Sequence, residues 1–245
     1  MIYQKFKETI KKIRSVITSF FFKQTMQHLE DIRSHELTVI LKILQLEGRQ
    51  IGKVLEIGAG AGWQARSLAA QGFQVSAIDV ETSYNCTNSV WPVIQYDGKK
   101  IPFDGNTFDI IFSSNVLEHI PHSFEFQKEI HRVSKTNALV IHILPSSSWR
   151  FWTNLTHLLK YWTFPRAHGE HSNNPLMEIL FFSRKWWNRF FCRTGWVVLR
   201  QESNHLFYTG CSIMDSMLSI KSRISLSCIL GSSCNIFVLK KSQSL

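Results

Sequence analysis

The chain of 245 residues has a formal net charge of +10, with 44% hydrophobic and 19% charged residues. This length and composition argue against a disordered chain and favour a globular protein with one large domain, alone or with an appendage. The five cysteines are scattered and form no Cys-x-x-Cys pair, which argues against a disulfide framework or a zinc ribbon. We therefore expect a reducing, cytoplasmic setting.

Residues 1–48 are predicted to form basic amphipathic helices. Between residues 10 and 20, isoleucines and a phenylalanine recur at helical spacing opposite lysines and an arginine. A second helical pattern covers about residues 26–46, and Gly48 is a stop signal. The short apolar run at residues 16–22 lacks a small-residue cleavage site, so we expect no secretory signal. A basic helix of this kind suits peripheral contact with an anionic membrane.

The pattern changes at residue 49, where short apolar runs begin to alternate with helical segments. Strands are predicted over residues 53–57, 73–78, 92–96, 108–112 and 138–144, and helices over residues 63–71 and 122–133. Strands that alternate with helices indicate a parallel sheet covered on both faces. Residues 49–145 are therefore predicted to form an α/β core of the Rossmann-like, doubly wound class.

Two further segments follow this core. Residues 146–194 are rich in aromatic side chains and are predicted to form a helical cap, with a helix over residues 176–193. The aromatic side chains either pack the cap onto the sheet, line a pocket for an apolar or ring-shaped molecule, or contact a membrane surface. Residues 195–245 are expected to complete the sheet with a strand that begins at Gly195 and another over residues 234–239.

A glycine-rich loop joins the first strand to the first core helix, where doubly wound sheets bind ligands. It reads Glu56-Ile-Gly-Ala-Gly-Ala-Gly62, and Trp63 occupies the position at which a dinucleotide fingerprint has glycine. Glu56 would repel a diphosphate, while Asp79, which ends the second strand, can accept hydrogen bonds from ribose hydroxyls. The loop therefore favours a positively charged nucleoside such as S-adenosylmethionine over NAD.

The order of these motifs resembles the class I S-adenosylmethionine-dependent methyltransferases, in particular the broad group that acts on small molecules. The resemblance covers residues 50–145 and rests on these segments: Val54-Leu-Glu-Ile-Gly-Ala-Gly-Ala-Gly62, Val75–Asp79, Tyr96–Gly98, Ile101–Asp104, Phe108–Ser113 and Val116–Ile120. It implies a seven-stranded sheet in the order 3-2-1-4-5-7-6, with the last strand antiparallel, and a cap on the substrate side. One departure is the loop at residues 135–137, which reads Lys-Thr-Asn where the family usually has proline and glycine.

The resemblance implies a set of residues for the methionine and ribose parts of the cofactor. Gly58, Ala59 and Gly60 would line the methionine part. Asp79 would hold the ribose. Glu56 joins this set because its charge suits the sulfonium and amino groups of the ligand.

A second set of residues is implied for the adenine end of the cofactor. Asp97 would meet the adenine amino group, with Tyr96 and Gly98 beside the ring. Asn115 and Val116 follow the fourth strand and would close over the cofactor.

Histidines are the candidates for acid–base chemistry, because methyl transfer to oxygen benefits from a base of suitable pKa. His119 is one candidate, and His168 and His171 in the cap are the others. The resemblance to some quinone methyltransferases offers Glu118 and His119 as a metal pair instead, but two ligands are too few for a site, so we predict no metal. His142 lies within a strand and is expected to be a core residue.

The resemblance implies an enzyme that methylates a small molecule, with an oxygen of a quinone-type ring or of a lipid-linked sugar as the acceptor. Nucleic-acid methylation is an alternative that the positive charge encourages. The segment Ser113–Val116, however, lacks the Asn/Asp-Pro-Pro-aromatic pattern usual in enzymes that methylate adenine or cytosine, so we expect no nucleic-acid partner. A non-catalytic protein that binds S-adenosylmethionine is the other alternative.

Overall fold

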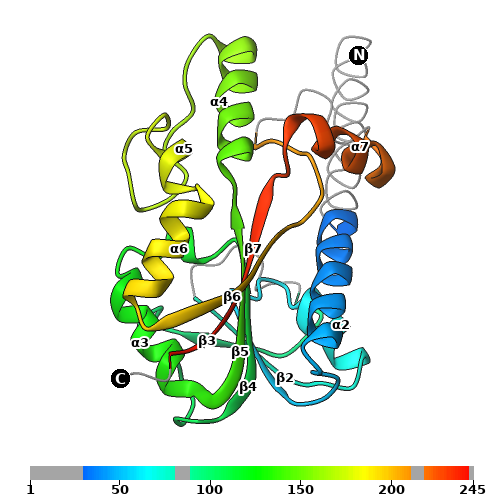
Figure 1. Cartoon of the computed structure of the whole chain (residues 1–245), viewed down its shortest axis with the longest axis vertical. Helices are drawn as coiled ribbons and strands as arrows, with labels where there is room; N and C mark the ends of the chain where they lie inside the picture. The colour runs from blue at the N-terminus through cyan, green and yellow to red at the C-terminus, as the bar shows by residue number, and fades with distance from the viewer. Residues whose placement is uncertain (1–29, 81–88, 211–217, 243–245) are drawn as a thin grey trace, which may run out of the picture.

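The computed structural model describes residues 30–80, 89–210 and 218–242 (Figure 1). Within these residues a single sheet contains β1 (Lys53–Ile57), β2 (Gln74–Val80), β3 (Val93–Tyr96), β4 (Phe108–Ser114), β5 (Ser134–Pro145), β6 (Trp196–Ser203) and β7 (Cys234–Lys241). The strand order is β3-β2-β1-β4-β5-β7-β6, with β1 to β5 parallel and β7 antiparallel to both β5 and β6. The predicted fold class and strand order are confirmed.

Helices cover both faces of this sheet. The helix over residues 30–46 and α2 (Trp63–Ala70) lie on one side, and α3 (Ser123–Val133) and α6 (Arg184–Arg193) lie on the other (Figure 1). The remaining described helical elements are η2 (Leu117–His119), α4 (Ser147–Tyr161), α5 (Glu178–Phe181) and α7 (Ile220–Leu230).

Two apolar clusters hold the helices against the sheet. On one face, Phe126 of α3 and Trp187 of α6 are fully buried among side chains of β4, β5 and β7. On the other face, Leu37 and Ile40 of the N-terminal helix pack with Leu68 of α2. Burial of each large apolar side chain contributes about 1.5–3 kcal/mol, so both layers are anchored by their inward-facing stripes.

The cap after β5 is more regular than the sequence suggested. The Oγ atom of Ser146 accepts a hydrogen bond from the Trp149 backbone N–H at 3.0 Å, which starts α4 directly after the strand. The single helix predicted over residues 176–193 is wrong. It is divided into α5 and α6, because Ser183 caps a new helix by accepting a hydrogen bond from the Trp186 backbone N–H at 3.2 Å.

The C-terminal segment contains a helix that the sequence did not predict. In α7 the serines and short apolar side chains follow no helical period, so an amphipathic pattern is absent. The sixth strand continues past Leu199 to Ser203 because it pairs along β7. The fifth strand begins at Ser134, four residues before the predicted start at Ala138.

The aromatic side chains of the cap divide into two groups. Trp187 and Phe191 are fully buried, which confirms that part of the set packs the cap onto the sheet. Trp162 is 86% exposed and Tyr161 is 52% exposed, at the far end of α4. The basic helix predicted at residues 10–20 lies outside the described residues. No helix within the described ranges is both long and apolar enough to span a bilayer.

Candidate active site

A cavity of about 380 Å³ opens at the carboxyl ends of β1, β2 and β4, where doubly wound sheets bind their ligands. It is lined by Gly58, Gly60, Asp79, Val80, Tyr96, Gly98, Asn115, Val116, His119, Ile120, Pro121 and His122. Seven of the ten predicted cofactor residues and one predicted base, His119, thus border a common space, whereas Glu56, Ala59 and Asp97 do not line it. The sequence did not single out His122, which reaches the turn after β3 through a 3.0 Å contact between its Nε2 atom and the Gly98 carbonyl oxygen.

Two positions of the glycine loop cannot carry a side chain. Gly58 has a φ of +73°, and a Cβ atom added there would lie 2.2 Å from Cγ2 of Val116. Gly62 has a φ of +82°, and its Cβ would lie 2.6 Å from Cβ of Trp91. Glycine is therefore required at both positions by backbone conformation and by close packing, and the loop leaves room for a ligand beside the sheet.

The loop also fixes the carboxylate of Asp79. The Gly60 backbone N–H donates a hydrogen bond to Oδ2 of Asp79 at 2.6 Å, and the Val80 N–H donates to Oδ1 at 2.7 Å. The residue is only 8% exposed but borders the cavity. Each carboxylate oxygen has a second lone pair, so the group is held in place and can still accept hydrogen bonds from a ligand.

Glu56 of β1 and Ala59 of the loop are not among the residues that line the cavity. Glu56 is 2% exposed, and its Oε2 atom has no hydrogen-bond partner among the described residues. Burial, together with the neighbouring charge of Asp79, raises the pKa of Glu56 to about 8. Glu56 is thus a buried acid whose charge a cation near the loop would stabilise.

The carboxylate of Asp97 is hydrogen-bonded within its own turn. Its Oδ1 atom accepts hydrogen bonds from the backbone N–H groups of Lys99 and Lys100, each at 2.9 Å. These bonds lower the pKa of Asp97. Tyr96 and Gly98 line the cavity on either side of it, whereas Asp97 does not. Its contact with adenine stays a prediction, and its observed role is to shape the turn.

A polar network from the N-terminal helix supports Asn115, which has a positive φ of 54°. Arg33 donates from Nη1 to the Ser114 Oγ atom at 2.9 Å and forms an ion pair with Glu36 at 2.6 Å. With its amide oxygen turned towards the guanidinium, Asn115 accepts a hydrogen bond from Nη1 of Arg33 at 2.6 Å. Sequence reasoning missed Arg33 because only the fold brings it to the end of β4.

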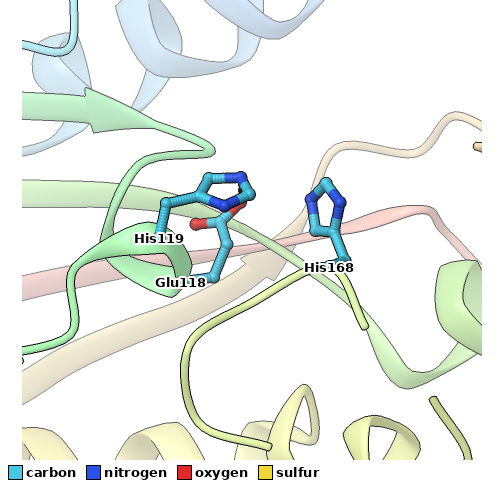
Figure 2. Close-up of side chains that lie close together, drawn as sticks. All are labelled: Glu118, His119 and His168. Atoms are coloured by element: carbon cyan, nitrogen blue, oxygen red, sulfur yellow. Dashed lines mark ion pairs between the residues drawn. The ribbon is translucent and has the colours of Figure 1, made fainter. Parts of the chain in front are cut away.

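A cluster of three polar side chains adjoins the cavity. Glu118 and His119 of η2 meet His168 of the cap, and their side chains point towards one another (Figure 2). One potential ligand atom from each lies within 4.8 Å of those of the other two. Glu118 is fully buried, neither carboxylate oxygen has a hydrogen-bond partner among the described residues, and burial raises its pKa to about 8.

The loop that carries His168 is fixed by a buried ion pair. Glu178 accepts hydrogen bonds through Oε1 from the backbone N–H groups of His168 and Gly169, at 2.8 and 2.6 Å. Its other carboxylate oxygen pairs with Arg150 at 2.7 Å, and both side chains are almost fully buried. Sequence reasoning missed this pair because its members belong to separate helices.

Both histidines of the cluster are neutral near pH 7. The ring of His119 is 44% exposed, and its partly desolvated position lowers its pKa. Burial lowers the pKa of His168 to about 4, with the nearby His119 and Arg150 adding to the effect. A neutral imidazole has a free nitrogen lone pair, so each ring can take up a proton or bind a metal ion.

The other two histidines singled out in the sequence lie apart from this cluster. The ring of His171 packs against Trp186, with centroids 4.7 Å apart, and borders no part of the cavity. His142 is fully buried, with its Nδ1 atom 2.7 Å from the Ser113 Oγ atom, so the expectation of a core residue is confirmed.

Comparison with known proteins agrees with this geometry. The model of a family described as a methyltransferase domain matches residues 26–201. An uncharacterised methyltransferase of Mycobacterium leprae is 28% identical over 152 residues, which are 54% of each chain. One of Mycobacterium marinum is 31% identical over 96 residues, covering 36% of this chain and 37% of the relative. The chain therefore spans about half or less of the length of these curated relatives.

Solved structures share the fold. A methyltransferase of Aquifex aeolicus described as S-adenosylmethionine-dependent superposes with a TM-score of 0.55 at 18% identity, over 88% of this chain and 96% of that one. Another of Mesorhizobium loti superposes with a TM-score of 0.53 at 12% identity, over 78% and 91%. The chain belongs to the methyltransferase-domain family, and its fold is that of the class I S-adenosylmethionine-dependent methyltransferases.

Proposed function

We propose that this chain transfers a methyl group from S-adenosylmethionine to an oxygen atom of a small-molecule acceptor. The observation that carries the proposal is the shared cavity, which the fixed carboxylate of Asp79 and the neutral ring of His119 both border. S-adenosylmethionine, when bound, supplies an electrophilic methyl group on a positively charged sulfur atom.

The residues around the cavity suit this cofactor. A volume of about 380 Å³ falls in the range usual for small-molecule sites. None of the described lining residues is a lysine or arginine that could neutralise a phosphate. Asp79 instead supplies negative charge near the glycine loop, and the buried acid Glu56 ionises more readily beside a positive charge, so both residues favour a cationic ligand.

Each part of the chain then has a task in holding the cofactor. Asp79 accepts hydrogen bonds from the ribose hydroxyls, and Gly58 and Gly60 allow close approach of the methionine part. Tyr96 and Gly98 flank the adenine ring. Positioning of this kind supplies much of the rate of methyl transfer, because the reacting atoms must be in line.

The histidines of the cluster act on the acceptor. His119 borders the cavity and is neutral, so it can receive the proton that the acceptor hydroxyl loses as its oxygen takes the methyl group. His168 lies beside it, with ring centroids 4.6 Å apart. His171 is left out of this role because its ring is packed among the cap tryptophans.

A ring-shaped acceptor is the better fit of the two small-molecule classes. The ring of Trp149, which is 8% exposed, lies 4.7 Å from that of His168, and the fully buried ring of Phe182 lies 6.2 Å from it, so the surroundings of His168 are aromatic. Aromatic surroundings favour flat, partly apolar ligands such as quinone-type rings. A sugar on a lipid carrier is the second candidate, supported by the exposed aromatic side chains near Trp162.

Calorimetric titration with S-adenosylmethionine and its demethylated product tests the cofactor assignment. The Asp79→Ala variant should lose roughly 1–3 kcal/mol of binding free energy, because the ribose hydrogen bonds are lost. The matched control is Asp104→Ala, an exposed aspartate in a turn away from the cavity, which should bind as the parent does. Absence of binding by the parent chain, or equal loss in both variants, would refute the assignment.

A transfer assay with isotope-labelled cofactor tests the acceptor. Hydroxylated aromatic rings should be labelled in preference to sugars, oligonucleotides and water, and the label should be found on oxygen. Labelling of oligonucleotides alone would replace the proposed acceptor class with nucleic acid.

A further inference from the structure

The carboxyl end of α4 and the loop after it expose a group of large apolar side chains. They lie between residues 159 and 164, each is about half exposed or more, and they are Leu159, Tyr161, Trp162 and Phe164. Figure 1 shows this end of α4 projecting away from the sheet. Single exposed apolar side chains are common on proteins, but a group of them close together marks a surface that binds a partner.

Trp162 has a backbone conformation that is unfavourable for its residue type. It ends α4 with a φ of 58° and a ψ of 21°, in the left-handed region, and its N–H donates to the Leu158 carbonyl oxygen at 2.8 Å. Glycine is the usual residue at such a helix end, because a Cβ atom is strained in this region. Burial does not offset the strain, since the Trp162 side chain is 86% exposed. An exposed ring kept at a strained position indicates a role outside the fold.

The charges among these apolar side chains are positive. Lys160 and Arg166 are both exposed, and the Lys160 Nζ atom lies 5.1 Å from the centroid of the Tyr161 ring. The sequence contains no aspartate or glutamate from residue 130 to residue 169. Aromatic, aliphatic and basic side chains without acidic ones are complementary to the boundary of an anionic lipid bilayer, where rings lie among the headgroups and cations meet the lipid phosphates.

Other occupants fit this surface less well. A second copy of the chain that paired through the same surface would bring Lys160 and Arg166 of both copies together, and like charges repel. A nucleic acid would match the charge, but it offers no apolar environment for the aliphatic side chain of Leu159. An anionic bilayer accommodates both the apolar and the basic side chains.

We propose that the α4 tip, defined as Leu159, Tyr161, Trp162 and Phe164 with Lys160 and Arg166, docks on a membrane that contains anionic lipids. The rings and Leu159 enter the headgroup region, and the two cations contact lipid phosphates. Docking on the membrane does not depend on the proposed function.

The position of the tip also bears on the acceptor, a step that rests on the proposed function. The loop after Trp162 leads to His168, whose ring centroid lies 4.6 Å from that of His119 at the cavity. Docking would therefore bring the acceptor side of the cavity close to the bilayer. The acceptor class that this arrangement serves is a hydroxylated small molecule held in the membrane by an apolar tail.

Co-sedimentation of the full chain with vesicles tests the docking. Vesicles of phosphatidylcholine with about one third phosphatidylglycerol should bind the chain more tightly than vesicles of phosphatidylcholine alone. High salt should weaken the binding without abolishing it, because salt screens the cations and leaves the apolar contacts in place. Absence of binding, or equal binding to both kinds of vesicle, would refute the proposal.

Trp162→Gly separates docking from stability, because the two expected effects have opposite signs. Glycine relieves the strain at this position, so the midpoint of thermal unfolding should rise by about 2–4 °C. Vesicle binding should weaken about tenfold, because a large apolar side chain no longer enters the headgroup region. Leu159→Gln should weaken it by a similar factor, since glutamine retains helix propensity without the apolar surface.

Matched controls lie outside the tip. Ile51→Gln changes a side chain that is 78% exposed ahead of β1, at the opposite end of the parallel strands from α4. Lys160→Gln should weaken vesicle binding about fivefold, whereas Lys128→Gln, at an exposed lysine of α3, should not. Equal vesicle binding by the tip variants and the control variants would overturn the assignment of the tip.

Three further measurements identify other outcomes. Light scattering without lipid that shows a dimer in the parent and a monomer in Trp162→Gly would assign the surface to a second copy of the chain. Oligonucleotide binding that Trp162→Gly abolishes would assign it to nucleic acid. Titration with S-adenosylmethionine separates the two proposals. Vesicle binding without cofactor binding would refute the proposed function alone, and cofactor binding without vesicle binding would refute the docking alone.

Discussion

The two walls of the cavity are assembled from the sequence in different ways. On the proposed cofactor side, Gly58 and Gly60 follow β1 and Asp79 lies at the end of the adjacent strand β2, and a hydrogen bond from the Gly60 N–H to Asp79 joins the two strand ends. On the acceptor side, His168 reaches Glu118 and His119 from a cap loop that is fixed by the pair of Arg150 and Glu178. The cofactor wall therefore depends on the sheet, while the acceptor wall depends on a long-range ion pair.

The ion pair of Arg150 and Glu178 gives the largest expected effect. Arg150→Met leaves Glu178 buried and uncompensated, which should lower the free energy of unfolding by about 3–5 kcal/mol. Denaturant titration measures this loss. Arg150→Met with Glu178→Gln should recover part of it, because the unpaired charge is then removed as well.

The same variant tests whether the two walls are independent. Under conditions where the Arg150→Met protein remains folded, its dissociation constant for S-adenosylmethionine should match that of the parent. A cofactor affinity that falls together with the stability would show that the cap and the glycine loop are coupled.

Gly58→Ala should distort the glycine loop on the proposed cofactor side of the cavity while leaving the cap intact. The new Cβ would lie 2.2 Å from Val116 at a φ of +73°, so we expect a loss of roughly 1–3 kcal/mol in cofactor binding or in stability. The control is Gly48→Ala, which has a similar φ of +69° but no atom within 4 Å of the added Cβ. Cofactor affinity measured by calorimetry should fall in the first variant only. Similar affinities in both would show that the contact with Val116 is unimportant.

A smaller effect is expected from the charge of Glu56. Its pKa is raised to about 8 by burial, so the carboxyl is protonated at neutral pH in the absence of ligand. A cationic cofactor binds better to the ionised form, so affinity should rise with pH up to about 8 and level off above it, by at most about tenfold per pH unit. The demethylated product lacks the sulfonium charge and should show a shallower slope.

Glu56→Gln provides the control for this pH dependence, because the amide cannot ionise. The difference in slope between the cofactor and its demethylated product should disappear in this variant. An unchanged difference would assign the pH dependence to another group.

Much of the cofactor wall could be predicted from local sequence. Local sequence identified β1 by its apolar run and the ligand loop by the glycines that follow it. It also identified Asp79 as the residue at the end of β2. Parallel strands place their carboxyl ends along one edge of the sheet, so residues that follow different strands meet there. The hydrogen-bond partners of the polar side chains were less predictable. Asp97, for example, accepts hydrogen bonds from the N–H groups of its own turn and does not line the cavity.

The cap could be predicted only in outline. Its aromatic composition indicated a packed helical layer, but the break at Ser183 and the exposure of Trp162 follow from contacts that no periodicity encodes. The unpredicted helix α7 lacks an apolar stripe and forms where Ser219 caps its start, with Arg223 buried against the Phe207 carbonyl oxygen. Tertiary contacts of this kind override weak local preferences.

The sequence by itself determined the alternation of strands and helices, the glycine loop and the acidic residue at the end of β2, because each depends on a few neighbouring residues and on the fixed geometry of parallel strands. The order of the strands was implied by the family resemblance. Only the tertiary structure decided that His168, and not His171, joins Glu118 and His119. That choice depends on how a buried ion pair orients a loop, and the energy of such a pair is set by burial and distance, which a linear sequence does not contain.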